Sequence, residues 1–179
     1  MYYQTDYVSP VGKIMMASDG VHLNGLWIEG QMYYGSTIKE EMQPKDSLPV
    51  FKKTKDWLER YFSGGRPEIS EIPLAPSGSD FRQKVWAMLC EIPYGEVTTY
   101  GRIAEKIAEL QNKKSMSAQA VGGAVGHNPI SIIIPCHRVV GTDGSMTGYA
   151  GGIDKKEWLL AHEGYLIKRL TITERDRLC

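Results

Sequence analysis

The type of hydrophobic pattern changes near residue 76, and this change constrains the fold more than any other feature of the sequence. Residues 2–7, 13–17 and 21–28 are typical of three short strands, because turn signals at 9–12 and 19–20 separate them. Beyond residue 78, apolar residues recur every three or four positions, which is the period of an amphipathic helix. A chain with its strands first and its helices last is expected to belong to the α+β class.

A proline-rich stretch separates the two patterns. Before it, apolar residues from Phe51 to Phe62 recur at helical spacing until glycines at 64–65 end the helix. Residues 67–78 contain several prolines and little periodicity, which favours an exposed linker. We therefore expect an N-terminal α/β unit over residues 1–76 and a C-terminal helical unit over residues 77–179.

Three helical segments are expected in the C-terminal unit. Ser79 and Thr99 stand where N-cap residues are favoured, and Ser117 precedes a short segment of small side chains. These segments span residues 81–92, 103–110 and 118–126. The last two, joined by a loop, fit helix-turn-helix geometry. The turn signal at 141–145 can form a wing, and a final helix is expected over 154–164.

The charge balance argues against a nucleic-acid partner when it is taken alone. Lys and Arg number 21, as do Asp and Glu, so no global field draws the protein toward a polyanion. The balance is uneven, with a net charge of −2 over residues 1–76, +2 over residues 77–179 and +3 over residues 100–140. On charge alone, an ordinary solvated surface explains that basic stretch better than phosphate binding does.

The cysteine count indicates a reducing compartment. Cys90, Cys136 and Cys179 are an odd number without close spacing, which disfavours a disulfide framework and a zinc site. The four histidines have no partners at metal-ligand spacing, so we expect no metal. The first residues lack the features of a secretory signal, and no apolar stretch approaches membrane-spanning length. We expect a soluble, cytoplasmic protein that contacts no membrane.

Cys136 is the candidate for covalent chemistry. It follows an apolar run at 130–134 and a proline, and His137 and Arg138 come directly after it. Cationic neighbours lower the pKa of a thiol, and the thiolate is the nucleophilic form. Adjacent residues of an extended chain point in opposite directions, so the sequence does not place His137 against the sulfur. A reactive thiol and a buried inert one are equally good explanations at this stage, whereas Cys90 is expected to pack in the core.

Several blocks around Cys136 closely resemble the O6-alkylguanine-DNA alkyltransferases, also called methylated-DNA–protein-cysteine methyltransferases. The blocks are NPISIIIPCHRVVG at 128–141, TGYAGG at 147–152, PYGEVTTY at 93–100, AVGGA at 120–124 and EWLLAHEG at 157–164. The similarity extends over about residues 81–164, and several blocks in the right order are a strong signal. It implies an N-terminal ribonuclease-H-like domain and a C-terminal winged helix-turn-helix-like domain that binds DNA.

The resemblance also implies single-turnover, direct-reversal repair of DNA. Such a protein flips an alkylated guanine out of the duplex from the minor groove and moves the alkyl group, a methyl for example, from O6 to a cysteine, here Cys136. It implies that His137 acts as a base through a water, that Glu163 orients His137, that Tyr100 donates a proton and that Asn128 braces the turn. The implied guanine pocket consists of Val139, Tyr149, Ala150 and Gly151. The implied DNA contacts are Gln119, Ala118, Ala120, Gly122, Arg138, Thr142, Lys113 and Lys114.

No cofactor is implied, and the expected partner of the monomer is duplex DNA containing O6-alkylguanine. O4-alkylthymine is a further possible substrate. The clearest departure from the family is Gln119, because the family commonly places an arginine between these two alanines. Glutamine can fill the vacated stack but carries no charge, so we expect weaker DNA binding or slower base flipping. Lys113 and Lys114, in a longer loop before Ser117, can supply phosphate contacts instead.

Three other functions are alternatives to alkyl transfer. A protein that senses alkylguanine without repairing it replaces the acceptor cysteine, but Cys136 is present. A thiol hydrolase using Cys136 and His137 lacks a recognisable oxyanion-hole loop and leaves the helix-turn-helix pattern unexplained. A regulatory DNA-binding module with an inert thiol is the third alternative, and methylation of Cys136 by damaged DNA distinguishes all three from the repair protein.

Overall fold

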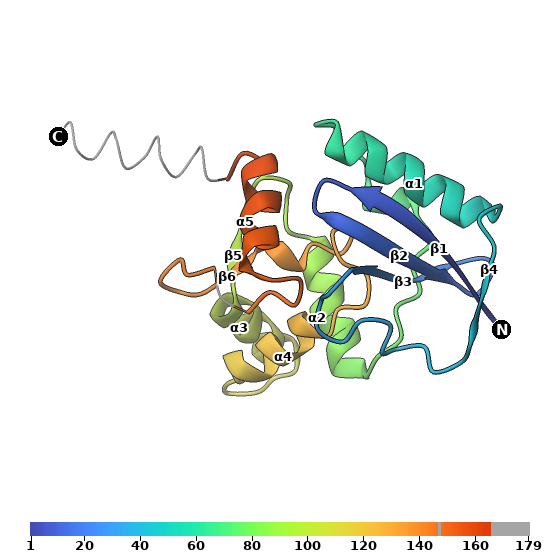
Figure 1. Ribbon diagram of the computed structural model, residues 1–179. Helices are drawn as coiled ribbons and strands as arrows, with labels where there is room; N and C mark the ends of the chain where they lie inside the picture. The colour runs from blue at the N-terminus through green and yellow to red at the C-terminus, as the bar shows by residue number, and fades with distance from the viewer. Residues whose placement is uncertain (147, 166–179) are drawn as a thin grey trace, which may run out of the picture.

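The computed structural model describes residues 1–146 and 148–165 (Figure 1). Thr147, within one of the family-like blocks, and Cys179 lie outside the described residues. The expected α+β class is confirmed, because a four-stranded sheet with one covering helix lies at one end and helices gather at the other.

The sheet is an antiparallel meander with one added edge strand. β1 (Tyr2–Ser9), β2 (Gly12–Ser18) and β3 (Leu23–Ile28) confirm the three expected strands. β4 (Met42–Pro44) pairs in parallel with β1, which gives the order β3-β2-β1-β4. The sequence did not indicate β4, because three residues in a polar segment carry too little periodicity.

Helix α1 (Pro49–Phe62) covers the sheet with one apolar face (Figure 1). Proline suits its first turn, where the missing N–H has no helical partner to lose. Phe51, Leu58 and Tyr61 are each at most 1% exposed, so the helix is anchored along its length.

The stretch expected to be an exposed linker is partly buried and paired. It contains η1 (Ile69–Glu71), and Ile72 is only 4% exposed. The backbone of Leu23 donates to the Pro73 carbonyl at 2.8 Å and accepts from the Ala75 N–H at 2.9 Å. The expectation of an exposed linker was wrong here because the edge strand β3 has free backbone groups that this segment satisfies.

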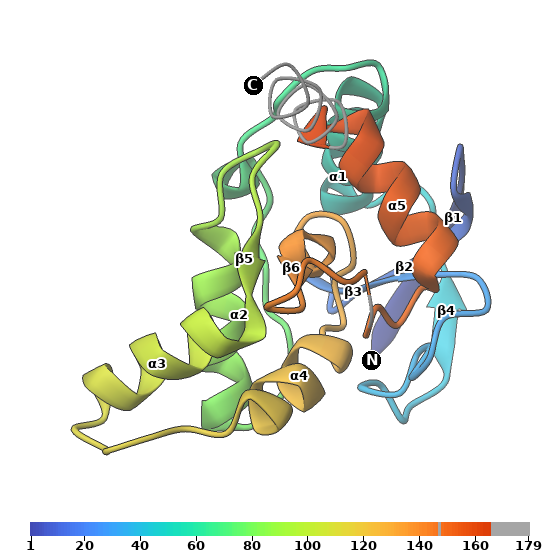
Figure 2. The same cartoon turned by 90° about the vertical axis from the view of Figure 1, so that its left-hand side faces the viewer.

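Two C-terminal helices begin at the expected caps, and a third has a serine cap that was not assigned from the sequence. Helix α2 (Asp80–Cys90) has Ser79 as its N-cap, α3 (Tyr100–Leu110) has Thr99, and α4 (Ala118–Gly126) has Ser117. Each cap side chain accepts a backbone N–H of the first turn, at 3.3, 3.1 and 3.2 Å respectively. Helix α4 packs against both α2 and α3, as Figure 2 shows, so the expected helix-turn-helix arrangement is present.

The remaining C-terminal elements surround the turn that carries Cys136. β5 (Thr98–Thr99) pairs in parallel with β6 (Val139–Val140), which directly follows η2 (Cys136–Arg138). The expected turn at 141–145 is closed by a hydrogen bond from the Gly141 N–H to the Ser145 carbonyl at 3.0 Å. Helix α5 (Ile153–His162) completes the fold.

Backbone hydrogen bonds join the two halves of the chain beside the candidate site. The Leu26 N–H of β3 donates to the Pro129 carbonyl at 2.8 Å, and its carbonyl accepts from Ser131 at 2.9 Å. One continuous apolar core contains residues from both halves. Because the two halves share this core, the expected division into two domains at residue 76 stays a prediction. Among the described helices, none has the length and apolar character needed to cross a membrane.

Candidate active site

Cys136 lies in a tight turn that Asn128 holds together. The Asn128 amide donates to the carbonyls of Ile130 and Ile134 at 3.2 and 2.9 Å, and its oxygen accepts from the Ile130 N–H at 3.0 Å. Within this turn Ile132 has a φ of 70°, a strained value for a β-branched residue. The position of Asn128 thus fits the bracing role that the resemblance implies.

His137 and Glu163 meet in the interior. The two side chains are fully buried, and His137 Nε2 lies 2.7 Å from Glu163 Oε1. The 3-10 turn of η2, rather than an extended strand, brings His137 and Arg138 to the same carboxylate. Because the carboxylate accepts only, His137 carries its proton on Nε2, which leaves Nδ1 as an acceptor. Within the described residues, the buried Nδ1 has no hydrogen-bond partner.

Glu163 is a buried carboxylate that receives donors from several elements. Arg138 Nε and Nη2 donate to it at 2.8 and 3.0 Å, the Gly95 N–H at 3.3 Å and the Tyr61 hydroxyl at 2.7 Å. Burial alone would raise the pKa of Glu163, but hydrogen bonds from His137 and Arg138, together with the charge of Arg138, outweigh it and hold the pKa well below its usual range. Glu163 is therefore ionised across the physiological pH range.

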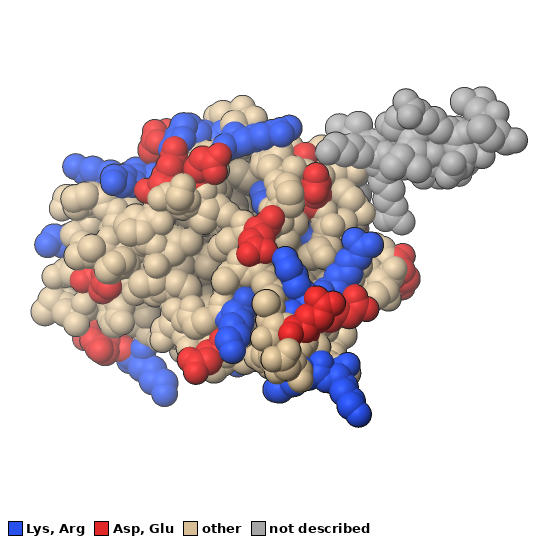
Figure 3. Space-filling view, turned by 180° about the vertical axis from the view of Figure 1, so that it is seen from behind, with Lys and Arg blue, Asp and Glu red and all other residues tan. Residues whose placement is uncertain are grey.

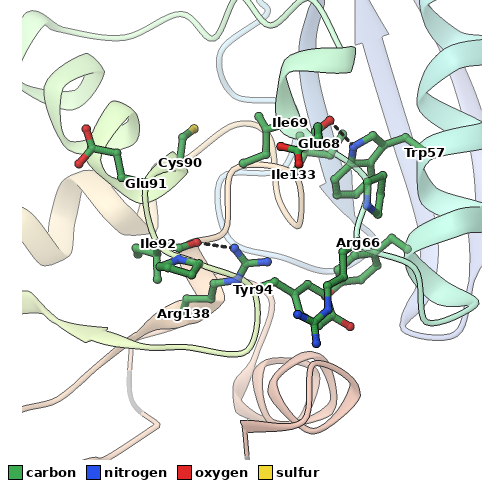
Figure 4. A pocket seen from close by; sticks show the side chains of 13 residues that line it. Trp57, Arg66, Glu68, Ile69, Cys90, Glu91, Ile92, Tyr94, Ile133 and Arg138 are labelled. Carbon is green, nitrogen blue, oxygen red and sulfur yellow. Dashed lines mark hydrogen bonds between the residues drawn. The ribbon is translucent and has the colours of Figure 1, made fainter.

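The expected contact between Arg138 and DNA is wrong. Arg138 is only 7% exposed, and its third guanidinium nitrogen donates to the Ile92 carbonyl at 2.7 Å (Figure 4). A guanidinium with all three nitrogens bound inside the protein is unavailable to a phosphate. Its role is to neutralise Glu163, and counting charges along the sequence cannot reveal that.

The Cys136 thiol needs help to ionise. Its side chain is 4% exposed, and burial raises the pKa of Cys136 despite hydrogen bonding from Asn128 and the charge of Lys156. Burial also lowers the pKa of His137, against the opposing effect of Glu163, so the imidazole is neutral and able to take a proton. A protonated thiol beside a neutral, oriented imidazole is an arrangement for activating a nucleophile.

Lys156 and Tyr100 add two further polar groups near the sulfur. Lys156 is fully buried, its Nζ donates to the Val139 carbonyl, and burial lowers its pKa to about 8. Burial, with the charge of Cys136, raises the pKa of Tyr100 to about 12, so its hydroxyl keeps its proton. A Cβ on Gly148 would stand 2.8 Å from that hydroxyl, so glycine permits the close approach of this loop.

The four residues of the implied guanine pocket are buried or partly exposed. Val139 is fully buried, Tyr149 is 8% exposed, and Ala150 and Gly151 are partly exposed. The Met32 N–H, from the loop after β3, donates to the Ala150 carbonyl at 3.0 Å. The N-terminal half of the chain thus contacts the loop that carries Ala150 and Gly151.

The exposed face of α4 carries four of the eight implied DNA contacts. Ala118, Gln119 and Ala120 are exposed and Gly122 is partly exposed, whereas Ala124 is buried and its carbonyl accepts from Trp86 Nε1 at 2.9 Å. Ala124 therefore lies on the opposite, buried side of the helix. The side chains of Lys113, Lys114 and Thr142 are also exposed.

Sequence reasoning missed three groups of this site. Lys156 had a usable signal, since it falls three and four residues before the buried Leu159 and Leu160 and so lies on the apolar face of α5. Tyr61 and the Gly95 N–H had none, because both are distant from Glu163 along the chain. No group of three or more metal-ligating side chains occurs within residues 1–146 and 148–165.

Both halves of the chain match domains of one known protein family. Residues 1–76 match the ribonuclease-like domain of 6-O-methylguanine DNA methyltransferase, and residues 80–165 match its DNA binding domain. The chain belongs to the 6-O-methylguanine DNA methyltransferase family. The family expected from the sequence is thereby confirmed.

Relatives of this methyltransferase family align over nearly the whole chain. A methylated-DNA–protein-cysteine methyltransferase of Haemophilus influenzae is 45% identical, and the alignment covers 90% of this chain and 86% of the relative. A crystal structure of Mycobacterium tuberculosis O6-methylguanine methyltransferase is 40% identical with a TM-score of 0.77, covering 91% of this chain and 93% of that one. The Mycobacterium tuberculosis protein in complex with DNA gives a TM-score of 0.74 at 40% identity, covering 90% of this chain and 91% of that one.

Proposed function

We propose that this chain repairs DNA by moving an alkyl group from O6 of guanine to the Cys136 sulfur, as a methylated-DNA–protein-cysteine methyltransferase. Membership of the family and the names of its relatives support this reaction class. The observation that carries the assignment to Cys136 is the buried pair of His137 and Glu163, 2.7 Å apart, whose histidine directly follows that cysteine in the same 3-10 turn. An inert structural thiol would not require a neutral imidazole fixed by a buried carboxylate.

The reaction moves one alkyl group and one proton. His137 Nδ1 takes the Cys136 thiol proton through a water, while Glu163 holds Nε2 and stabilises the imidazolium. The sulfur attacks the alkyl carbon, a carbon–sulfur bond forms and the carbon–O6 bond breaks. The departing guanine accepts a proton from Tyr100, and the proton on His137 replaces it. The thioether is stable, so each molecule reacts once and needs no cofactor.

Duplex DNA is the proposed partner, with α4 in the minor groove. The small side chains at 118, 120 and 122 let the helix backbone approach the sugars, and Gln119 fills the space left by the flipped guanine. Basic and acidic side chains lie interspersed on the face of the molecule shown in Figure 3, in keeping with the net charge of zero of the chain. Action as a monomer in the cytoplasm stays a prediction from the sequence.

The test is transfer of a radiolabelled methyl group from an O6-methylguanine duplex to the protein. We expect wild type and Cys90→Ser to take up the label and Cys136→Ser to take up none. Labelling of Cys136→Ser would refute the assignment of the acceptor. Binding of the duplex without any transfer by wild type would instead identify a sensor of alkylguanine.

A further inference from the structure

Helix α1 of the N-terminal half reaches the carboxylate of the candidate active site. The Tyr61 hydroxyl donates to Glu163 Oε1 at 2.7 Å, the same oxygen that His137 Nε2 contacts at 2.7 Å. Tyr61 is 1% exposed, and 102 positions separate it from Glu163. The phenol and the imidazole therefore share one buried acceptor atom, where each hydrogen bond affects the other strongly.

The ring and the backbone of Tyr61 both contact neighbouring side chains. Its ring stacks on Trp57 with centroids 5.5 Å apart, and its carbonyl accepts from His162 Nε2 at 2.7 Å. A pocket of about 280 Å³ opens beside it, lined in part by Arg66, Tyr94 and Arg138 (Figure 4). Side chains do not fill the space beside Tyr61 completely. The contact between α1 and Glu163 therefore depends on the Tyr61 hydrogen bond as well as on packing.

We propose that Tyr61 is a positioning residue for alkyl transfer, which fixes Glu163 and limits how strongly that carboxylate raises the basicity of His137. The proposal rests on the proposed function of Cys136 and His137. A neutral donor on Oε1 withdraws part of the negative charge that His137 otherwise feels. The ribonuclease-like half of the chain thus takes part in the chemistry as well as in folding.

The direction of the effect follows from the groups around the pair. The charged and titratable groups that interact with Glu163 or His137 are Arg138, Lys156, Tyr61, Tyr94 and Tyr149. Burial, and then Glu163, raises the pKa of Tyr61 well above its ordinary value, so Tyr61 stays a donor throughout the working pH range. Removing its hydroxyl leaves more charge on Oε1, which favours the imidazolium and raises the pKa of His137.

The decisive variants change the donor and leave the ring in place. For Tyr61→Phe we expect the acid limb of the transfer rate to move up by about half a pH unit or more. The plateau rate should fall by about tenfold, less than the roughly hundredfold cost of a 1 Å misplacement. Replacement of Tyr61 by 3-fluorotyrosine, a stronger donor of nearly the same shape, should move the acid limb the opposite way.

Trp57→Phe is the matched control, because Trp57 stacks on Tyr61 but its own indole N–H donates to the Glu68 carbonyl. It should leave the acid limb where wild type has it. The pKa of His137, followed by NMR in the protein without DNA, should shift in parallel with the kinetics in each Tyr61 variant.

An unchanged acid limb and an unchanged His137 pKa in both Tyr61 variants would overturn the proposal, even if Tyr61→Phe were slower. Equal shifts in Trp57→Phe would also overturn it, because packing would then be the cause. If wild type left Cys136 unalkylated, the proposed function would fail, while the NMR titration would still decide whether Tyr61 sets the basicity of His137.

Discussion

Replacing Glu163 with Gln is expected to destabilise the protein strongly, because two buried groups depend on this carboxylate. Arg138 is 7% exposed and loses its only carboxylate partner among the described residues. The single amide oxygen of glutamine replaces two carboxylate oxygens, so the donors of His137 and Arg138 can no longer all be satisfied. Removing one member of a buried ion pair costs about 3–5 kcal/mol, because the remaining charge stays desolvated. That is a large part of the roughly 5–15 kcal/mol by which domains are stable.

The assay is urea unfolding of the full chain at pH 7, with Glu71→Gln as the control. Glu71 pairs with Arg60 at the surface, where both side chains are more than 40% exposed and solvent screens the attraction, so its replacement should cost far less. Equal losses of unfolding free energy in the two variants would refute the claim that Glu163 is a buried charge on which Arg138 and His137 depend.

The pH dependence gives a second check on Glu163. The pKa of Glu163 is lower in the folded protein than in the unfolded chain, so its stabilisation is present above the unfolded pKa and is lost as pH falls through the folded one. Glu163→Gln should therefore lose less stability than wild type on acidification. A steeper acid loss in the variant would contradict the direction of the shift.

Three further predictions concern DNA binding and the turn. Gln119→Arg should raise DNA affinity or speed transfer, because a cation replaces a neutral side chain at the groove; no change in binding titrations and single-turnover rates would refute this. Alanine at both Lys113 and Lys114 should weaken binding alike for all sequences and flatten its salt dependence, so an unaltered salt slope would count against these contacts. Asn128→Ala should cost about 2–3 kcal/mol in urea unfolding and slow transfer, because three buried hydrogen bonds are lost; a variant as stable and as fast as wild type would show that the brace is unnecessary.

Local signals predicted much of the fold. Ser79 and Thr99 marked the starts of two helices because capping is a short-range interaction visible in sequence. β4 escaped because it is a three-residue edge strand whose pairing with β1 is decided by tertiary structure. The pairing of residues 73–75 with β3 was missed for the same reason. The proline content of a segment can be read from the sequence, but the strand edge that the segment covers is set by the tertiary structure.

The site residues that belong to family-like sequence blocks could be predicted. Contacts between residues that lie far apart in the sequence could not. Resemblance named Cys136, His137 and Glu163, and the structure brings the last two within 2.7 Å. It did not indicate that Arg138 faces inward or that Tyr61 donates to the same carboxylate. Both depend on contacts between segments that the sequence places far apart.

The most direct test of the central claim is the mass of the peptide containing Cys136 after the protein meets excess duplex with O6-methylguanine. We predict one methyl increment on Cys136, one repaired guanine per protein molecule and no further reaction. A methyl group on another residue, an unmodified Cys136 beside repaired DNA, or repair of many guanines per molecule would contradict the account.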